Sequence, residues 1–203
     1  MVTHPLWRPY QPSANARRQE QRVAHRQVQP PPLQEHQARW TGDFSHVRAV
    51  IERALGGRQL AIEHVGSTSV PDLVAKPVLD VDLTVADVRD ESGYVPALEA
   101  VGFRLLFRDE IAGDAHRQLA YAAPNTNLHV WNPGAIEVRR HRLFVDFLRT
   151  HQPSRKYYAE AKRTAGQHPV QGRYNDLKSA AVYDIYELAF LADDRLHEPQ
   201  PRR

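Results

Sequence analysis

Two aspartates, Asp80 and Asp82, stand two residues apart in the segment VLDVDLTV. The alternation in this segment predicts a β-strand, and side chains two apart on a strand project from the same face. Two such carboxylates can hold one hard cation jointly, and magnesium keeps coordination positions open for substrate phosphates. On these residues alone, a metal or phosphate site and an ordinary solvated strand face explain the pair equally well.

A loop of small polar residues precedes the aspartates. It comprises Gly66, Ser67, Thr68 and Ser69, and it follows the short apolar segment LAIEHV. Backbone N–H groups and hydroxyls with little side-chain bulk are what a phosphate cradle requires. Lys76 lies between this loop and the aspartates, where its ammonium group is placed to neutralise a phosphate. We therefore predict phosphate or nucleotide binding by these five residues.

Further polar residues are candidates for contacts with a substrate. Arginine suits bidentate recognition of phosphate or carboxylate, and Arg117 follows His116 at the start of a predicted strand. Lys178 lies near the start of the last helix, where the helix dipole disfavours a cation, and Tyr174 precedes it. A lysine in that position is expected to reach inward. The candidates for substrate contacts are His116, Arg117, Asn127, Tyr174 and Lys178, and the alternative for the pair His116-Arg117 is a strand edge in contact with water.

The segments that position these residues predict a small mixed sheet with helices. Apolar residues between Trp40 and Leu55 recur at spacings of three and four, which predicts a helix that ends at Gly56. Residues 95–101 predict a second helix, and three further strands are predicted in FRLLFRDEI, RQLAYAAP and TNLHVWN. The chain from Glu137 onward is helical in pattern. The expected fold is α+β (α/β), with a small mixed β-sheet flanked by helices and a helical C-terminal third.

Composition predicts one domain with two extensions in this chain of 203 residues. Residues 1–34 are rich in Gln, Pro and Arg and are expected to be disordered, residues 35–195 to form a single domain, and residues 196–203 a tail. The absence of cysteine excludes disulfides, thiolate zinc sites and cysteine nucleophiles. A net charge of +3 without a basic cluster disfavours nucleic acid as a partner. With neither a signal peptide nor a membrane span in the pattern, we expect a cytoplasmic protein.

The run IEHVGSTSVPDLVAKPVLDVDL strongly resembles the signature of the GrpB-like family, a branch of the DNA polymerase beta-type nucleotidyltransferase superfamily. The likeness continues through later segments, including HRLFVDFLR, and covers nearly everything except residues 1–34. The superfamily transfers nucleotidyl groups from nucleoside triphosphates with magnesium held by three carboxylates. The resemblance implies that residues 35–195 have a nucleotidyltransferase-like fold. It also implies that Gly66 and Ser67 contact the triphosphate and that Asp80 and Asp82 bind the metal.

The sequence departs from the superfamily pattern at the third metal-binding carboxylate. The segment TNLHVWN places His129 in the corresponding position, with Asn127 two residues earlier on the same face. A neutral imidazole is a poorer ligand than a carboxylate for magnesium and a better one for zinc, manganese or nickel. Glu110 is the other candidate for a third ligand, provided that its strand turns this side chain inward.

Our leading interpretation is a metal-dependent nucleotidyltransferase that acts on a nucleoside triphosphate and a small-molecule acceptor. Its catalytic residues would be Asp80 and Asp82, and its metal, Mg²⁺ or Mn²⁺, would be held by Asp80, Asp82 and His129, with Zn²⁺ or Ni²⁺ as options if His129 is a ligand. The first alternative is a non-catalytic nucleotide-binding or metabolite-binding module that has lost the third carboxylate. The second is a transition-metal-dependent hydrolase built on the same three residues together with His116. The identity of the acceptor and the oligomeric state stay open.

Overall fold

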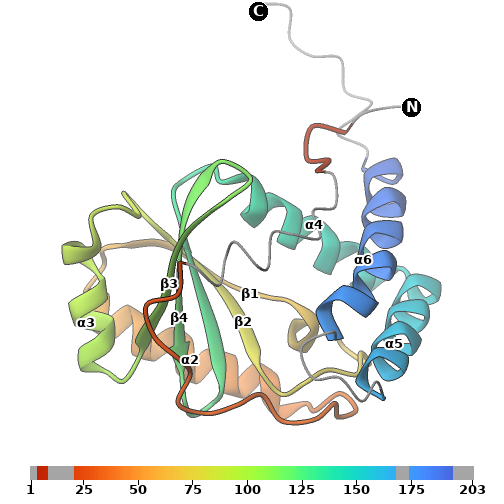
Figure 1. Cartoon of the computed structure of the whole chain (residues 1–203), viewed down its shortest axis with the longest axis horizontal. Helices are drawn as coiled ribbons and strands as arrows, with labels where there is room; N and C mark the ends of the chain where they lie inside the picture. Colours follow the sequence, from red (N-terminus) through yellow and green to blue (C-terminus); the bar gives the residue numbers. More distant parts are fainter. Residues whose placement is uncertain (1–3, 9–20, 168–173, 194–203) are drawn as a thin grey trace, which may run out of the picture.

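Five strands form one mixed sheet with helices on both sides in the computed structural model, which describes residues 4–8, 21–167 and 174–193 (Figure 1). The strands are β1 (Gln59–Val65), β2 (Leu79–Val85), β3 (Arg104–Ile111), β4 (Asp114–Tyr121) and β5 (Thr126–Trp131). The helices are α2 (Arg39–Leu55), α3 (Val95–Ala100), α4 (Ile136–Thr150), α5 (Gln152–Gly166) and α6 (Tyr174–Leu191), with two short 3₁₀ helices, η1 (Ser67–Ser69) and η2 (Glu91–Gly93). The predicted α+β fold is confirmed.

The strand order in the sheet is β1-β2-β5-β4-β3. Strands β2 and β5 are parallel, and the other neighbours are antiparallel. The register pairs Asp80 with Asn127 and Asp82 with His129, and it pairs His129 in turn with Gln118 of β4. Because paired residues project from the same face, polar side chains that are distant in the sequence share one face of the sheet.

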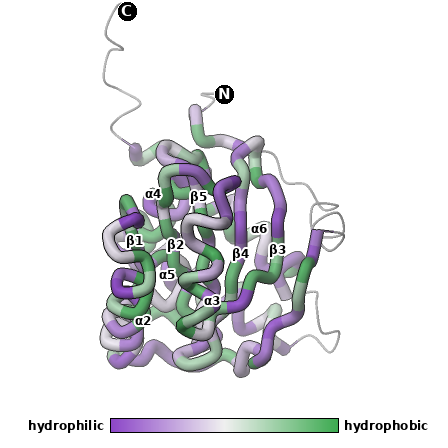
Figure 2. The backbone as a smooth tube through the Cα atoms, turned by 90° about the vertical axis from the view of Figure 1, so that its left-hand side faces the viewer, coloured by the Kyte–Doolittle hydropathy of each residue, from purple (hydrophilic) through white to green (hydrophobic). Residues whose placement is uncertain are grey.

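The opposite face of the sheet carries the main core. Helices α2 and α3 pack there, through residues such as Val47 and Leu98, against Leu79, Val81 and Leu83 of β2. A second apolar cluster joins α4, α5 and α6 to residues 70–74, on the side of the sheet that carries the polar face (Figure 1). Figure 2 shows that the neighbouring ends of β3 and β4 are hydrophilic. In the part of the chain that the structure describes, no helix is long and apolar enough to cross a membrane.

The N-terminal segment differs from the expected disorder wherever the structure describes it. Residues 21–24 run beside β3, where Val23 N donates to Leu106 O at 2.8 Å (Figure 1). Gln34 forms a β-bridge with Ala75, and Leu6 is buried against α6. The physical reason is that the edge strand β3 offers unpaired backbone groups, which this segment satisfies. Residues 1–3 and 9–20 of this extension, together with the tail 196–203, lie outside the described residues.

Candidate functional site

A cleft of about 430 Å³ opens over the polar face of the sheet. Its walls come from β2, β4 and β5, from residues 75–78, and from α5 and α6. Seven of the residues singled out in the sequence line it, and they are Ser67, Lys76, Asp80, Asn127, His129, Tyr174 and Lys178. The structure therefore brings the glycine-serine loop, the first aspartate and the start of the last helix together around one cavity.

Gly66 brings the loop directly against Asp80. Its φ of 69° lies in the region that favours glycine, and a Cβ atom built on it would lie 2.8 Å from the Cβ of Asp80 and overlap the carboxylate. Only a residue without a side chain allows this approach. Gly66 therefore sets the distance between the loop and the strand that carries Asp80.

The three hydroxyls of the loop point in different directions. Ser67 lines the cleft, and its Oγ accepts a hydrogen bond from Lys162 Nζ at 2.6 Å. Thr68 is buried, with its Oγ1 bonded to the His64 ring at 3.0 Å, and Ser69 Oγ donates to Gly66 O at 2.7 Å. Of the predicted phosphate-binding hydroxyls, Ser67 lines this cleft, whereas those of Thr68 and Ser69 bind within the protein.

The carboxylate of Asp80 lies beside Asn127 and His129 and remains open to the cleft. Asn127 Nδ2 donates to its Oδ1 at 2.7 Å, and His129 Nε2 lies 4.0 Å from the same oxygen. The Asp80 side chain is 33% exposed. Burial opposes its charge, but His129 and Asn127 together hold the pKa of Asp80 below its usual value. Asp80 is therefore an ionised carboxylate at neutral pH.

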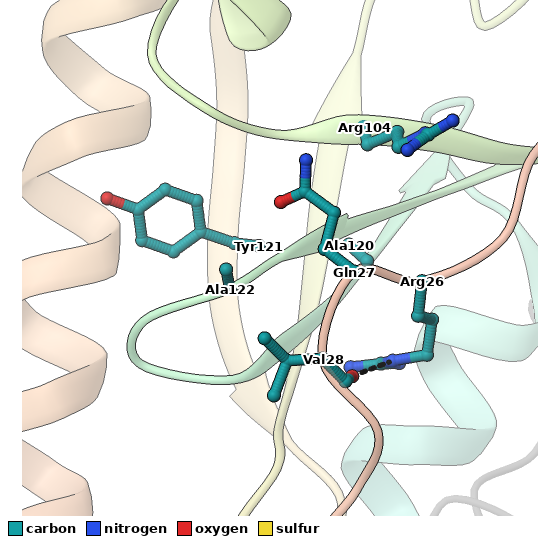
Figure 3. Close-up of a pocket in the computed structure, with 7 residues that line it drawn as sticks. All are labelled: Arg26, Gln27, Val28, Arg104, Ala120, Tyr121 and Ala122. Carbon is teal, nitrogen blue, oxygen red and sulfur yellow. Dashed lines mark hydrogen bonds between the residues drawn. The ribbon is translucent and has the colours of Figure 1, made fainter.

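Asn127 has its orientation fixed by the N-terminal segment. Its Oδ1 accepts hydrogen bonds from Gln118 Nε2 at 3.1 Å and from the Arg26 guanidinium, so its Nδ2 is left to donate to Asp80. Arg26 also donates to Asn125. Figure 3 shows the Arg26 segment crossing the end of β4, around a hollow of about 10 Å³ that is too small for a ligand. The extension is thus part of the site.

Asp82 lies on the same strand face as Asp80 but in different surroundings. Its side chain is 1% exposed, its Oδ1 accepts from Trp131 Nε1 at 2.9 Å, and its Oδ2 accepts from His141 Nδ1 at 2.8 Å. Burial disfavours both charges, yet each partner favours the charge of the other. The pKa of His141 is raised to about 9, and that of Asp82 is lowered. Contrary to expectation, Asp82 does not line the cleft, because α4 covers this end of the strand.

The sequence analysis did not identify His141 as a site residue, although its position on a helix could have indicated a buried polar contact. It belongs to the stripe His141, Phe144, Val145 and Leu148, which has helical spacing and whose other members are apolar. A polar residue on an otherwise apolar stripe has to meet a buried partner. The partner here is Asp82, which local pattern alone could not identify.

His129 ends a buried chain of hydrogen bonds. His116 Nε2 lies 3.1 Å from His129 Nδ1, and His116 Nδ1 lies 2.5 Å from Asp109 Oδ1. His116 thus bridges Asp109 and His129 through its two ring nitrogens. The other ring nitrogen of His129, Nε2, lies on the side of Asp80 and the cleft. His116 itself is buried and reaches the cleft through His129.

Two sequence-based expectations on β3 and β4 need correction. Glu110 does not turn inward, because it is 62% exposed and pairs with Arg89 at 2.9 Å, whereas its neighbour Asp109 is buried. Arg117 lies on the opposite face of the sheet from His116, where its Nε donates to Glu91 Oε1 at 2.6 Å. Adjacent strand residues face opposite ways, so Arg117 does not contact a ligand in this cleft.

Lysine is concentrated at the cleft. The sequence holds 27 Lys and Arg residues, of which only four are lysines, and three of these four, Lys76, Lys162 and Lys178, line the cleft. Lys162 is 1% exposed, and its Nζ donates to Val74 O at 2.9 Å as well as to Ser67. Burial, followed by the nearby Lys178, holds the pKa of Lys162 well below its usual value. Three lysine amino groups are thus placed around the cavity that Asp80 lines.

Tyr174 contacts two of these lysines. Lys76 Nζ lies 4.1 Å from the centre of its ring, and Lys178 Nζ lies 5.2 Å from it. Cation–π contacts of this kind hold ammonium groups without neutralising them. Burial, and then Lys178, lowers the pKa of Lys76. The two lysines therefore remain available to an anion.

The three-carboxylate magnesium set of the superfamily does not fit this site. Asp82 is bonded to Trp131 and His141, and His129 occupies the third place. Within residues 4–8, 21–167 and 174–193, no group of three or more His, Asp or Glu side chains is arranged to hold a metal ion. Asp80 is the member of the expected set that offers a carboxylate to the cleft.

Comparison with known proteins identifies relatives along most of the chain. The family model of the GrpB protein matches residues 30–188. The UPF0157 protein BH1888 of Halalkalibacterium halodurans is 41% identical over 162 residues, which cover 77% of this chain and 81% of the relative. A dephospho-CoA kinase of Mycobacterium leprae is 26% identical over 183 residues, which cover 74% of this chain and 44% of the kinase.

A solved structure shows the same fold. The crystal structure of the conserved protein GrpB from Enterococcus faecalis superposes with a TM-score of 0.70 at 25% sequence identity, over 79% of this chain and 98% of that chain. Arg26, which orients Asn127, precedes the part that the family model matches. The match to the family model covers well over half of the sequence. The chain therefore belongs to the GrpB protein family.

Proposed function

We propose that the cleft binds a nucleoside triphosphate, with the phosphate chain on Lys76, Lys162 and Lys178. The observation that carries this proposal is the placement of three of the four lysines around one cavity. A compact ammonium group is a common phosphate ligand, and the Ser67 hydroxyl adds a further donor beside Lys162. The volume of about 430 Å³ falls in the range of small-molecule sites, roughly 300–1,000 Å³.

The role proposed for magnesium is limited by the residues present. Magnesium is usually bound by one or two carboxylates together with substrate phosphates, so an ion that enters with the triphosphate needs little more than Asp80. The same holds for manganese. The set does not support a two-metal site, and His129 contributes a nitrogen rather than a carboxylate. The proposal is therefore binding of the nucleotide as its magnesium complex.

Transfer of the nucleotidyl group to a small acceptor is a second candidate function. One observation favours it over simple binding: Asp80 is ionised and reachable from the cleft, although a purely structural carboxylate would be paired as Asp82 is. The resemblance to the nucleotidyltransferase superfamily points the same way. Release of pyrophosphate from labelled triphosphates in the presence of a metabolite pool would support transfer. Binding without any release would support the module without catalysis.

Calorimetry with ATP, with and without Mg²⁺, tests the binding proposal. Lys178→Met should weaken binding at least tenfold, because a hydrogen bond to a charged group contributes about 1.5–3 kcal/mol. Lys156→Met is the matched control, since Lys156 is the fourth lysine and is exposed on α5 away from the cleft. Asp80→Asn should remove the dependence on Mg²⁺. Equal affinities for wild type and Lys178→Met would contradict the proposal.

Proton uptake gives an independent test. A phosphate beside Lys162 favours its charged form, whereas burial in the empty cleft disfavours it. Binding of ATP should therefore take up protons, and the apparent enthalpy should change with the ionisation enthalpy of the buffer. Lys162→Met should abolish this dependence on the buffer. Binding that releases protons would show that the triphosphate does not contact Lys162.

A further inference from the structure

A second hollow, of about 390 Å³, lies beside the cleft and differs from it in character. Its walls are mainly aromatic and aliphatic side chains of α4, α5 and α6. Phe144 packs edge-on against Tyr158, with ring centres 5.5 Å apart, and tilted against Tyr186, with ring centres 4.9 Å apart. Val182 contributes a further apolar surface. A flat ring is the group that such walls accommodate best.

The hollow and the cleft are neighbours. Asn175 and Lys178 of α6 line both of them. Gly66 lines the hollow and packs directly on Asp80, which lines the cleft. A molecule in the hollow would therefore lie next to the ligand of the cleft and close to the accessible carboxylate.

His141 supplies the hollow with a polar group. Its Nδ1 donates to Asp82, and among the described residues its Nε2 has no hydrogen-bond partner, while the side chain is 28% exposed. Pairing with the buried Asp82 favours the imidazolium form, in which Nε2 also carries a proton. The side chain thus leaves one N–H donor for a molecule in the hollow.

The charge around His141 selects the kind of group that it can bind. Its positive charge is already balanced by Asp82, and Asp80 is near enough to add to the negative potential. Beside His141 a carboxylate or phosphate would meet the negative charges of Asp82, Glu137 and Asp80. The Lys178 ammonium group, which also lines the hollow, is assigned to the phosphates in the cleft. A neutral hydroxyl can accept from Nε2–H without repulsion. We infer that the hollow binds a second small molecule, a flat aromatic ring with a hydroxyl group that accepts a hydrogen bond from His141.

The place of this second molecule rests on the proposed function, because the cleft beside it is assigned to the triphosphate. The inference names the acceptor class that a transfer reaction would use, a hydroxyl-bearing ring compound. Binding in the hollow can nevertheless be measured without any nucleotide. The two proposals therefore succeed or fail separately.

Fluorine NMR with three matched probes tests the inference on the full chain. The probes are 4-fluorophenol, fluorobenzene, which lacks the hydroxyl, and 4-fluorobenzoate, which carries a charge. We expect 4-fluorophenol to bind at least several-fold more tightly than both other probes. Equal affinity for fluorobenzene and 4-fluorophenol would overturn the role of His141, and tighter binding of the benzoate would overturn the preference for a neutral group.

Variants of α6 locate the binding. Ser179→Phe and Val182→Phe each place a ring into the hollow from successive turns of the helix and should weaken 4-fluorophenol binding at least tenfold. Leu177→Phe is the matched control, because Leu177 is exposed on the same helix and lines neither cavity. Unchanged binding in a folded Ser179→Phe or Val182→Phe variant would overturn the inference.

A separate titration with ATP distinguishes the two proposals. Wild-type protein that binds ATP but not 4-fluorophenol would overturn the inference about the hollow and leave the proposed function standing. Protein that binds 4-fluorophenol but not ATP would contradict the proposed function and leave the hollow as a ligand site.

Discussion

The ion pair of His141 and Asp82 should make the stability of the protein depend on pH in the alkaline range. The pKa of His141 is about 9 in the folded chain, against an ordinary value of 6.5. Because the folded value is the higher one, the stabilisation is fully present below pH 6.5 and is lost as the pH rises through 9. At about 1.4 kcal/mol per pH unit, the total loss is about 3 kcal/mol.

The pair also has a contribution at acidic pH, with the opposite sign. The pKa of Asp82 is lowered, so its stabilisation is present above the ordinary range of a carboxyl group and is lost as the pH falls through the folded value. The two effects together predict that the free energy of unfolding is largest at pH values between the pKa of folded Asp82 and that of folded His141. The alkaline arm is the sharper test, since carboxyl groups have finished titrating there.

Urea unfolding followed by circular dichroism from pH 6.5 to 9.5 measures the alkaline arm. The comparison is with the double variant Asp82→Asn/His141→Gln, which keeps hydrogen-bonding groups and removes both charges, because a single change would leave a buried charge without its partner. His46→Gln is the control for an exposed histidine. We expect the unfolding free energy of wild type to fall relative to the double variant by about 3 kcal/mol. Parallel curves for the two proteins would refute the assignment of a charged pair.

Three further predictions concern the loop and the N-terminal segment. Gly66→Ala should destabilise the fold by about 1–3 kcal/mol from backbone strain alone. Gly134 also has a positive φ, but no atom of the described residues lies near its missing Cβ, so thermal unfolding should show a smaller loss of stability for Gly134→Ala than for Gly66→Ala. Arg26→Ala should weaken ATP binding, measured by calorimetry, because Arg26 orients Asn127, which in turn binds Asp80. Arg26→Lys should not restore the affinity, because one ammonium group cannot replace a planar guanidinium that donates to both Asn127 and Asn125. Leu6→Ala should destabilise by about 2–5 kcal/mol in urea unfolding, since Leu6 is buried against α6, whereas a disordered segment would show no effect.

The local pattern of the sequence predicted the strand of the two aspartates and their common face. What it could not predict is that Asp80 and Asp82 have different surroundings. The difference depends on α4, which is more than fifty residues away in the sequence and covers one of them through His141. Periodicity reports which face a side chain takes, and only tertiary packing decides what lies over that face.

The hydrogen-bonded chain of Asp109, His116 and His129 could not be predicted from the local sequence pattern for another reason. The three residues lie on β3, β4 and β5, and their contact depends on the pairing of these strands in the sheet. Strand parity could have excluded Arg117, because it is adjacent to His116 and must face the other way. Composition misjudged residues 21–34 because polar segments can still satisfy the backbone of an edge strand.

The contrast between the two aspartates supports the proposal that the cleft binds a ligand that brings its own cation. Asp82 has a permanent counter-charge in His141, so its electrostatics are complete within the protein. Asp80 instead has an amide at 2.7 Å and a ring nitrogen at 4.0 Å beside it. The lysines near it are held by Ser67, Val74 and the ring of Tyr174. An anion alone would be attracted by the lysines and repelled by Asp80, whereas a triphosphate that brings its own cation satisfies both signs at once. Positive and negative groups left unmatched in one cavity therefore favour a cation-bound polyphosphate over a simple anion.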